Sequence, residues 1–252
     1  MLVLISPAKN LNANCDNSVI SSFTTPLFLE NSKKIVYTLR KYSSESLSKL
    51  MNVSNKISIL NYERFIKWTM PFNINNSYLA VLLFQGDVYK GLSVKDFNKE
   101  DFAFAQKTIR ILSGLYGILK PLDLIQPYRL EMATPLKIGK YINLYDFWGN
   151  KITDAINQEK NNNYLINLAS VEYFKSINKK YLKLKLINIF FKEKKNGNYS
   201  VIGIHAKKAR GVMARYIIKN KINDPKDLKN FNMNSYRYNE DLSEDSDWVF
   251  TR

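Results

Sequence analysis

The chain has 252 residues, of which 45% are hydrophobic and 24% are charged, a balance typical of a folded globular protein. Its single cysteine, Cys15, excludes an internal disulfide, and its single histidine, His205, argues against a zinc centre, an iron–sulfur centre or a Ser-His-Asp triad. The net charge of +16 suggests a polyanionic partner such as nucleic acid. Part of the lysine excess accompanies Asn and Ile, as an A/T-rich genome would encode, so the placement of the cations matters more than their sum.

The N-terminal half predicts a strand, a series of helices and a second strand. LVLI at 2–5 is a short buried strand, after which Ser6 is expected to cap a turn that has Pro7 at its first helical position. An amphipathic helix is predicted over 26–42, with shorter helices over 45–52 and 54–68. YLAVLLF at 78–84 predicts a buried strand that ends at the turn QGD. Asn98–Asp101 resembles a capping box for a helix that continues to about Leu112 and points Arg110 away from its apolar face.

The C-terminal half predicts a hairpin and a basic helix. Residues 112–132 are expected to be ordered but irregular, followed by a helix over about 145–160, a strand over 164–169 and a short helix from Ser170. Two strands, 181–193 and 199–206, should flank a turn at Asn196-Gly197, before a helix over 206–221 and a last strand near 246–252. We expect one compact mixed α/β domain over 1–252, with a mixed sheet and surrounding helices.

The sequence also predicts a cytoplasmic protein. Its longest apolar run is far shorter than the roughly 18 residues of a membrane span, and no signal peptide is expected before Leu2. We expect no membrane association.

The helix over 206–221 carries the strongest functional signal. Its predicted buried face is Ala209, Val212, Met213, Tyr216 and Ile217, and its cations include Lys207, Lys208, Arg210 and Arg215. Cations in the first turns are unfavourable for a helix alone, so an anionic partner would explain them, whereas an ordinary solvated face is the alternative. Gly211 and Ala214 form a strip of small residues that would let a backbone or a phosphate approach closely.

A glycine pair offers a second candidate site. Gly114-Leu115-Tyr116-Gly117 follows the predicted helix and is compatible with a helix-hairpin-helix-like element, in which backbone N–H groups bind a phosphate. Two residues separate the glycines and Pro121 interrupts the next helix, so a glycine C-cap with a tight turn is the alternative.

Two further motifs are candidate ion-binding sites. Ser6 and Lys9 have the S-x-x-K spacing of penicillin-recognising enzymes, but the accompanying S-D-N and K-T-G motifs are absent. We therefore expect an anion cradle at Ser6 and Lys9, with a cap and a surface lysine as the alternative. Arg129 is expected either to grip a phosphate or to pair with Glu131 or Asp123. Asp87 and Asp123 form a general acid/base pair only if the fold brings them together.

Taken together, the motifs resemble those of one family. LISPAK, FQGDVYKGL, LSGLYGILKPLDLIQPYRLEM, DFWGNKIT, NLASVEYFKSI and AKKARGVMARYII occur in the order seen in the YaaA family of bacterial peroxide-stress proteins. The resemblance implies a fold of the family's own type with a basic cleft, binding of double-stranded and distorted DNA, and protection against peroxide, partly by limiting free iron. It implies no established enzyme activity. The chain departs from the family pattern at Val171 and at Ser235-Tyr236.

Two functional hypotheses follow. The first is a DNA-binding stress protein with little sequence specificity, acting as a monomer without a cofactor or tightly bound metal. Its expected DNA contacts are Ser6, Lys9, Gly114, Leu115, Tyr116, Gly117, Arg129, Lys207, Lys208, Arg210 and Arg215. The second is an enzyme for a small anionic or nucleotide substrate, with acid–base chemistry at Ser6, Asp87 or Tyr116. A narrow, deep pocket joining Ser6, Asp87, Arg129 and Lys207 would favour the enzyme, and a broad basic groove would favour DNA.

Overall fold

The helices and strands of this computed structural model belong to a chain described over residues 1–15, 22–195 and 197–252. The strands are β1 (Leu2–Ile5), β2 (Asn10–Leu11), β3 (Tyr78–Leu79), β4 (Phe84–Gln85), β5 (Ile109–Ser113), β6 (Gly117–Leu119), β7 (Leu124–Ile125), β8 (Tyr164–Asn167), β9 (Lys185–Lys195), β10 (Asn198–Ser200), β11 (Arg237–Asn239) and β12 (Asp247–Thr251). The α-helices are α1 (Leu29–Leu39), α2 (Ser44–Met51), α3 (Asn55–Lys67), α4 (Ala80–Leu83), α5 (Asp87–Leu92), α6 (Lys99–Thr108), α7 (Leu144–Trp148), α8 (Lys151–Asn157), α9 (Val171–Phe174) and α10 (Gly203–Lys219). Short 3-10 helices cover Val94–Asp96, Pro225–Asn230 and Met233–Ser235.

The main sheet has the strand order β11-β12-β9-β8-β1-β5-β6, with β10 paired to β9. The five strands from β12 to β5 are parallel to their neighbours, whereas β11, β10 and β6 are antiparallel additions. All four residues of β1 have no exposed surface, as expected for a central parallel strand covered on both faces. The predicted mixed α/β domain with a mixed sheet is confirmed.

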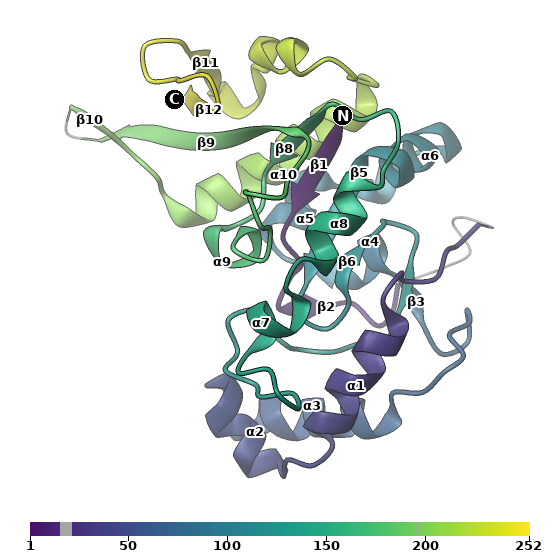
Figure 1. Cartoon of the computed structure of the whole chain (residues 1–252). Coiled ribbons are helices and arrows are strands. Elements are labelled where there is room, and N and C mark those ends of the chain that lie inside the picture. Colours follow the sequence, from purple (N-terminus) through teal and green to yellow (C-terminus); the bar gives the residue numbers. More distant parts are fainter. Residues whose placement is uncertain (16–21, 196) are drawn as a thin grey trace.

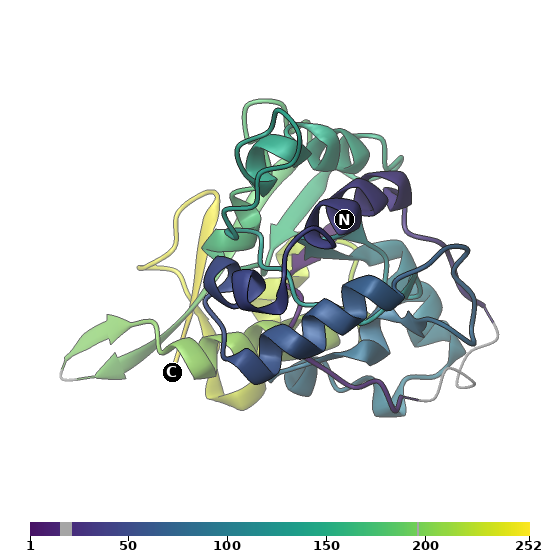
Figure 2. The same cartoon turned by 90° about the horizontal axis from the view of Figure 1, so that it is seen from below.

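The position of β1 decides where a ligand can bind. After β1 the chain reaches β5 on one side of it and later returns to β8 on the other, so the direction of winding reverses between β1 and β8. In Figure 1, β1 (purple) runs from the N-terminus toward the part of the molecule formed by α1, α2, α3 and α7, and Figure 2 shows the helices from below. Ligands of open α/β sheets bind outside the carboxyl ends of the strands at such a reversal.

Two predicted elements in the first half of the chain are wrong. The run 78–84 is β3, α4 and β4, because Ala80 and Val81 donate their N–H groups to the carbonyls of Asp123 and Pro121 at 2.9 and 3.0 Å. The predicted capping box of Asn98 and Asp101 is confirmed, but its helix ends at Thr108 and the next five residues form β5.

As a consequence Arg110 is only 3% exposed and contacts Glu159, with Nε at 2.8 Å from Oε1. The prediction that Arg110 points away from the apolar face of a helix is therefore wrong, because Arg110 lies in the buried strand β5.

Three smaller differences concern the ends of elements. Ser6 is followed by an extended segment that leads into β2, so it does not cap a helical turn. The helix predicted over 145–160 is interrupted by Gly149, whose φ of +48° separates α7 from α8. The β9–β10 hairpin is confirmed, with Asn196 of its predicted turn outside the described residues, and α10 begins at Gly203 within the predicted second strand.

Helices α5 and α10 touch backbone to backbone at two glycines. A Cβ on Gly211 would lie 1.8 Å from the carbonyl oxygen of Val88, and a Cβ on Gly91 would lie 2.3 Å from that of Lys208. No rotamer change relieves such an overlap, because the neighbouring atoms belong to the main chain. The strip of small residues on α10 therefore accommodates the backbone of α5.

We expect Gly211→Ala to destabilise the protein by about 3 kcal/mol or more, since α5 and α10 would have to separate. Thermal unfolding followed by circular dichroism measures the effect, which corresponds to a drop in Tm of roughly 6–12 °C. Gly203→Ala is the matched control, because it lies in the same helix and no atom stands within 4 Å of its added Cβ. Equal melting temperatures for both variants would contradict the close helix contact.

One flank of α10 is fixed by ion pairs. Arg215 Nη2 lies 2.5 Å from Asp96 Oδ2, and Asp101 accepts hydrogen bonds from Lys219 and Lys221 at 2.7 and 2.6 Å. Burial alone would raise the pKa of Asp101, but the hydrogen bonds from the two lysines lower it to about 2. These contacts join α10 and the residues after it to the start of α6.

The lowered pKa of Asp101 predicts acid sensitivity. Its stabilising effect is complete above the ordinary aspartate pKa of about 3.9 and is lost as the pH falls toward 2. Asp101→Asn should lose about 1.5–3 kcal/mol of unfolding free energy at neutral pH and flatten the decline between pH 4 and 2, as measured by urea unfolding. Asp245→Asn, which alters an exposed carboxylate, is the control and should follow the wild-type profile. An unchanged profile in Asp101→Asn would show that the lysine contacts contribute nothing.

Candidate functional site

A cavity of about 490 Å³ lies beyond the carboxyl ends of β1 and β8. Its walls come from the segment after β1, the start of α5, the segment after β8 and the N-terminal half of α10. Its position matches the reversal in the winding of the sheet, where α/β proteins bind ligands. The cavity brings together the charged residues Lys9, Asp87, Glu172, Lys207 and Arg210 and the hydroxyl-bearing residues Ser6, Tyr89, Ser170 and Tyr173.

Hydrogen bonds tie the two strand ends together at the base of the cavity. The backbone N–H of Ser170 donates to Ser6 Oγ at 2.8 Å, and the two serine hydroxyls are 3.3 Å apart. The Tyr89 hydroxyl donates to the carbonyl of Ser6 at 3.1 Å. Burial raises the pKa of Tyr89 well above its ordinary value, so this phenol stays neutral and remains a donor.

Ser6 and Lys9 are not hydrogen-bonded to one another as a nucleophile and its base would be. Lys9 Nζ lies 2.7 Å from Glu131 Oε2, and no hydrogen bond among the described residues joins it to Ser6. Ser6 Oγ instead accepts a hydrogen bond from the N–H of Ser170. Both side chains nevertheless line the cavity, where a hydroxyl and an ammonium group are donors for an anion.

Lys207 and Arg210 are the cations of α10 that face the cavity. They are three residues apart, so they project from the same face of the helix. Within the described part of the chain neither has a carboxylate within salt-bridge distance. Burial lowers the pKa of Arg210 below its ordinary value, although a guanidinium remains protonated at neutral pH. A partly buried charge without a counterion is costly, and an anionic ligand would remove that cost.

The other cations of α10 are placed differently. Arg215 lies on the opposite flank, where it pairs with Asp96 and donates to the carbonyl of Ser93 at 2.6 Å. These contacts hold α10 against the segment before α6, and the DNA contact expected of Arg215 stays a prediction. Lys208 is exposed on the same turn as Lys207 but does not line the cavity.

The glycine hairpin belongs to the core, and the predicted helix-hairpin-helix-like element is not confirmed. Gly114, Leu115, Tyr116 and Gly117 are all buried and connect two antiparallel strands, β5 and β6. The N–H of Tyr116 donates to Ser113 Oγ at 2.9 Å, so it is not free to bind a phosphate. A Cβ on Gly117 would lie 2.8 Å from the ring of Trp148, which explains this glycine by packing.

Arg129 forms the internal salt bridge that was one of its two predicted roles. Its Nη2 lies 3.1 Å from Glu131 Oε1, and Glu131 in turn holds Lys9. Arg129 does not line the cavity, and its buried Nε has no hydrogen-bond partner. The guanidinium thus acts on the site through Glu131 and the placement of Lys9.

Asp87 and Asp123 do not form an acid/base pair. Asp87 lines the cavity described above, whereas Asp123 lines a different one of about 590 Å³ and accepts hydrogen bonds from Thr24 and the N–H of Lys120. Burial raises the pKa of Asp123, and its hydrogen bonds to Thr24 and Lys120 oppose that effect. Its contacts are those of a residue that fixes a turn.

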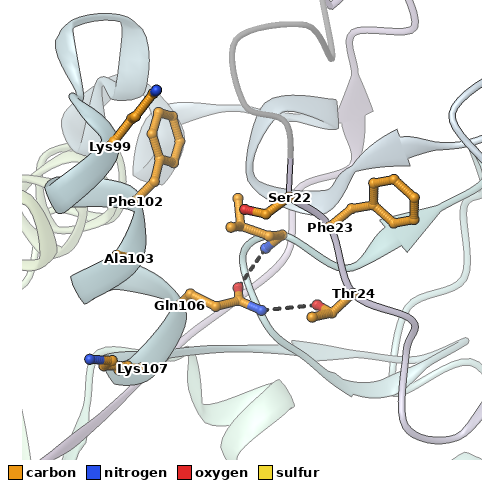
Figure 3. A pocket seen from close by; sticks show the side chains of 9 residues that line it. Ser22, Phe23, Thr24, Lys99, Phe102, Ala103, Gln106 and Lys107 are labelled. Atoms are coloured by element: carbon orange, nitrogen blue, oxygen red, sulfur yellow. Dashed lines mark hydrogen bonds between the residues drawn. The ribbon is translucent and has the colours of Figure 1, made fainter.

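A third cavity, of about 440 Å³, holds none of the predicted site residues. Figure 3 shows that Gln106 of α6 bridges its walls, since its amide donates to Thr24 at 2.9 Å and its carbonyl accepts from the N–H of Leu122 at 2.8 Å. Lys99 and Lys107 point away from this hydrogen-bonded group. The polar side chain of Gln106 therefore holds α6 against the segment before α1.

Sequence reasoning missed three polar members of the site that lie after β8, namely Ser170, Glu172 and Tyr173. They belong to the segment that follows this buried strand, and that position was the available signal. The resulting cavity contains cations and carboxylates together, so it can bind an anion beside groups that accept hydrogen bonds. Among the described residues no three His, Cys, Asp or Glu side chains are grouped as metal ligands, and no helix there is long and apolar enough to cross a bilayer.

Comparison with known proteins shows the family of the chain along almost its full length. The family model described as peroxide stress protein YaaA matches residues 1–242. A UPF0246 protein of Acaryochloris marina is 49% identical over all of both chains. UPF0246 proteins of Colwellia psychrerythraea and Neisseria meningitidis serogroup A are 49% and 46% identical, covering all of this chain and 99% and 98% of their own. The chain therefore belongs to the family of peroxide stress protein YaaA.

Proposed function

We propose that this peroxide stress protein binds duplex or distorted DNA through the basic side of the cavity at β1, β8 and α10. The observation that carries the proposal is the convergence of Lys207 and Arg210, without carboxylate partners in the described chain, on the carboxyl edge of the sheet. Lys9 adds a third cation at the same place, and Lys208 adds an exposed one beside it. Phosphate contacts of this kind position DNA without reading its sequence, so we propose little sequence preference.

The proposed contact set is smaller than the set expected from sequence. Arg215 is neutralised by Asp96, the glycine hairpin is buried and Arg129 is bound to Glu131. Lys207, Lys208 and Arg210 remain as proposed phosphate contacts, with the Ser6 hydroxyl as a further donor. Lys9 is kept as a fourth contact although it pairs with Glu131, because it lines the cavity and its side chain is 60% exposed. Bound as a monomer, the protein would shield DNA from peroxide damage, and help in limiting iron-driven damage is part of the same proposal.

Charge reversal on α10 tests the proposal. With four phosphates neutralised, the logarithm of affinity should fall with the logarithm of salt concentration at a slope of about −3.6. In Lys207→Glu/Lys208→Glu we expect at least about tenfold weaker binding to every duplex sequence and a slope smaller by about 2 in magnitude, measured by fluorescence anisotropy at several ionic strengths.

The matched control is Lys194→Glu/Lys195→Glu, which makes the same change in net charge on exposed residues of β9. Equal weakening in both double variants would mean that only total charge matters. Unchanged affinity in a folded Lys207→Glu/Lys208→Glu protein would remove α10 from the interface.

A second candidate function is catalysis on a small anionic or nucleotide substrate. It is favoured by the meeting of Ser6, Asp87 and Lys207 in one confined cavity, although Arg129 does not join them. In this reading the cations hold the substrate and Asp87 transfers a proton. If wild-type protein turns over a nucleotide in a screen of phosphate esters, Asp87→Asn should abolish that turnover while nucleotide binding persists. Turnover that survives in Asp87→Asn would contradict the assigned role.

A further inference from the structure

We infer that the cavity at β1, β8 and α10 is a site for one nucleoside phosphate unit, supplied either as a free nucleotide or as a nucleotide turned out of a distorted strand. The strand-borne source rests on the proposed DNA binding, whereas the free-nucleotide source does not. The inference concerns what enters the cavity, which is a separate question from what binds the surface around it.

The size of the cavity selects a single unit. Its volume of about 490 Å³ lies in the range of roughly 300–1,000 Å³ that is typical of small-molecule sites. A double helix, with a major groove alone about 12 Å wide, cannot enter such a space. A duplex can therefore only rest on the rim, and filling the cavity requires a separate or an unstacked nucleotide.

The distribution of charge fits the two ends of a nucleotide. Lys207 and Arg210 supply unpaired cations from α10, which suits a phosphate group. Asp87 and Glu172 line the same cavity and would repel a row of phosphates. Glu172 accepts the N–H of Ala133 through Oε1 at 3.2 Å, and its Oε2 has no partner among the described residues. Carboxylate oxygens accept hydrogen bonds from sugar hydroxyl and base amino groups, which one nucleotide provides beside its phosphate.

The remaining wall offers ring surfaces and an exposed apolar side chain. Tyr89 and Tyr173 line the cavity and are 8% and 9% exposed, so their aromatic rings lie largely shielded from solvent beside it. Val171 also lines the cavity and is 85% exposed. Because so little of Val171 is packed, a larger side chain there would obstruct the cavity without disturbing the core.

The first experiment measures binding of free nucleotides. Adenosine and cytidine 5′-monophosphate and inorganic phosphate are titrated separately into the full chain by calorimetry. We expect the mononucleotides to bind at least about tenfold more tightly than phosphate, a difference that the nucleoside contacts supply. Phosphate binding as tightly as the nucleotides would overturn the nucleoside part of the inference.

Matched variants locate the site. Lys207→Glu and Val171→Trp should each weaken mononucleotide binding by about tenfold or more. Lys194→Glu makes the same charge change on an exposed residue of β9 outside the cavity, and Ile142→Trp enlarges a side chain that is 67% exposed elsewhere. We expect both controls to bind mononucleotides like the wild type, with all four variants melting near the wild-type temperature. Equal loss in Lys207→Glu and Lys194→Glu, or no loss in Val171→Trp, would overturn the assignment of the cavity.

The second experiment separates the strand-borne source from the proposed function. A labelled duplex with a one-nucleotide bulge is compared with the perfect duplex, and we expect tighter binding of the bulged form that Val171→Trp abolishes. If the protein binds duplex normally but shows neither a preference for the bulge nor binding of mononucleotides, the inference is wrong and the proposed function stands. If it binds mononucleotides but no duplex, the proposed function is wrong and the cavity is a site for free nucleotides.

Discussion

The site depends on the contact between the backbones of α5 and α10. Gly91 and Gly211 let the main chains of the two helices touch. Any side chain at Gly211 would overlap the backbone of α5. Asp87 begins α5, and Lys207 lies one turn before Gly211 on α10, so this contact decides how far apart opposite charges stand across the cavity. A glycine inside a helix costs roughly 1 kcal/mol relative to alanine. In return, the close contact fixes the distance between the start of α5, which carries Asp87, and the part of α10 that carries Lys207.

The cations of α10 divide into two groups with different physical roles. On one flank Arg215 and Lys219 meet Asp96 and Asp101, which removes their charge as a source of attraction for a ligand. On the cavity side Lys207 and Arg210 keep theirs. Net charge of the whole chain is thus a weak guide to the site, because a paired and an unpaired cation count equally in the sum. What distinguishes them is the position of carboxylates that lie about 120 residues away in sequence.

The elements that sequence analysis predicted best are those with a decisive local pattern. The uninterrupted apolar run of β1, the capping box of α6 and the helical periodicity of α10 all survive in the structure. The boundary between α6 and β5 does not, because a parallel strand buried on both faces loses the alternation that would mark it. Ile109 and Leu112 also happen to satisfy a helical period, which extended the predicted helix into the sheet.

The site was predictable in its residue types and only partly in its geometry. Ser6, Lys9, Lys207 and Arg210 were identified by local motifs, and they converge. The glycine hairpin was misjudged because its partner, Trp148, lies some 30 residues further along the chain and local sequence cannot show it. For Arg129 the partner Glu131 is only two residues away, but the sequence could not decide between this salt bridge and a phosphate contact, because both use the same guanidinium. Only the contacts between distant segments of the folded chain decide between such alternatives.

Under the proposed function, the carboxylates that line the cavity beside its cations would give a physical reason for discriminating between regular and distorted DNA. Regular duplex presents closely spaced phosphates, which would gain from the exposed lysines at the rim but would be repelled by Asp87 and Glu172 if they moved inward. A nucleotide that is already unstacked would reach the cavity without the few kcal/mol needed to extrude it from a paired helix. Under the proposed function, the rim would therefore supply affinity that does not depend on sequence, and the cavity would add affinity only where the strand is disturbed. The preference would arise from the state of the DNA and from the mixed charge of the cavity, without any contact that reads a base sequence.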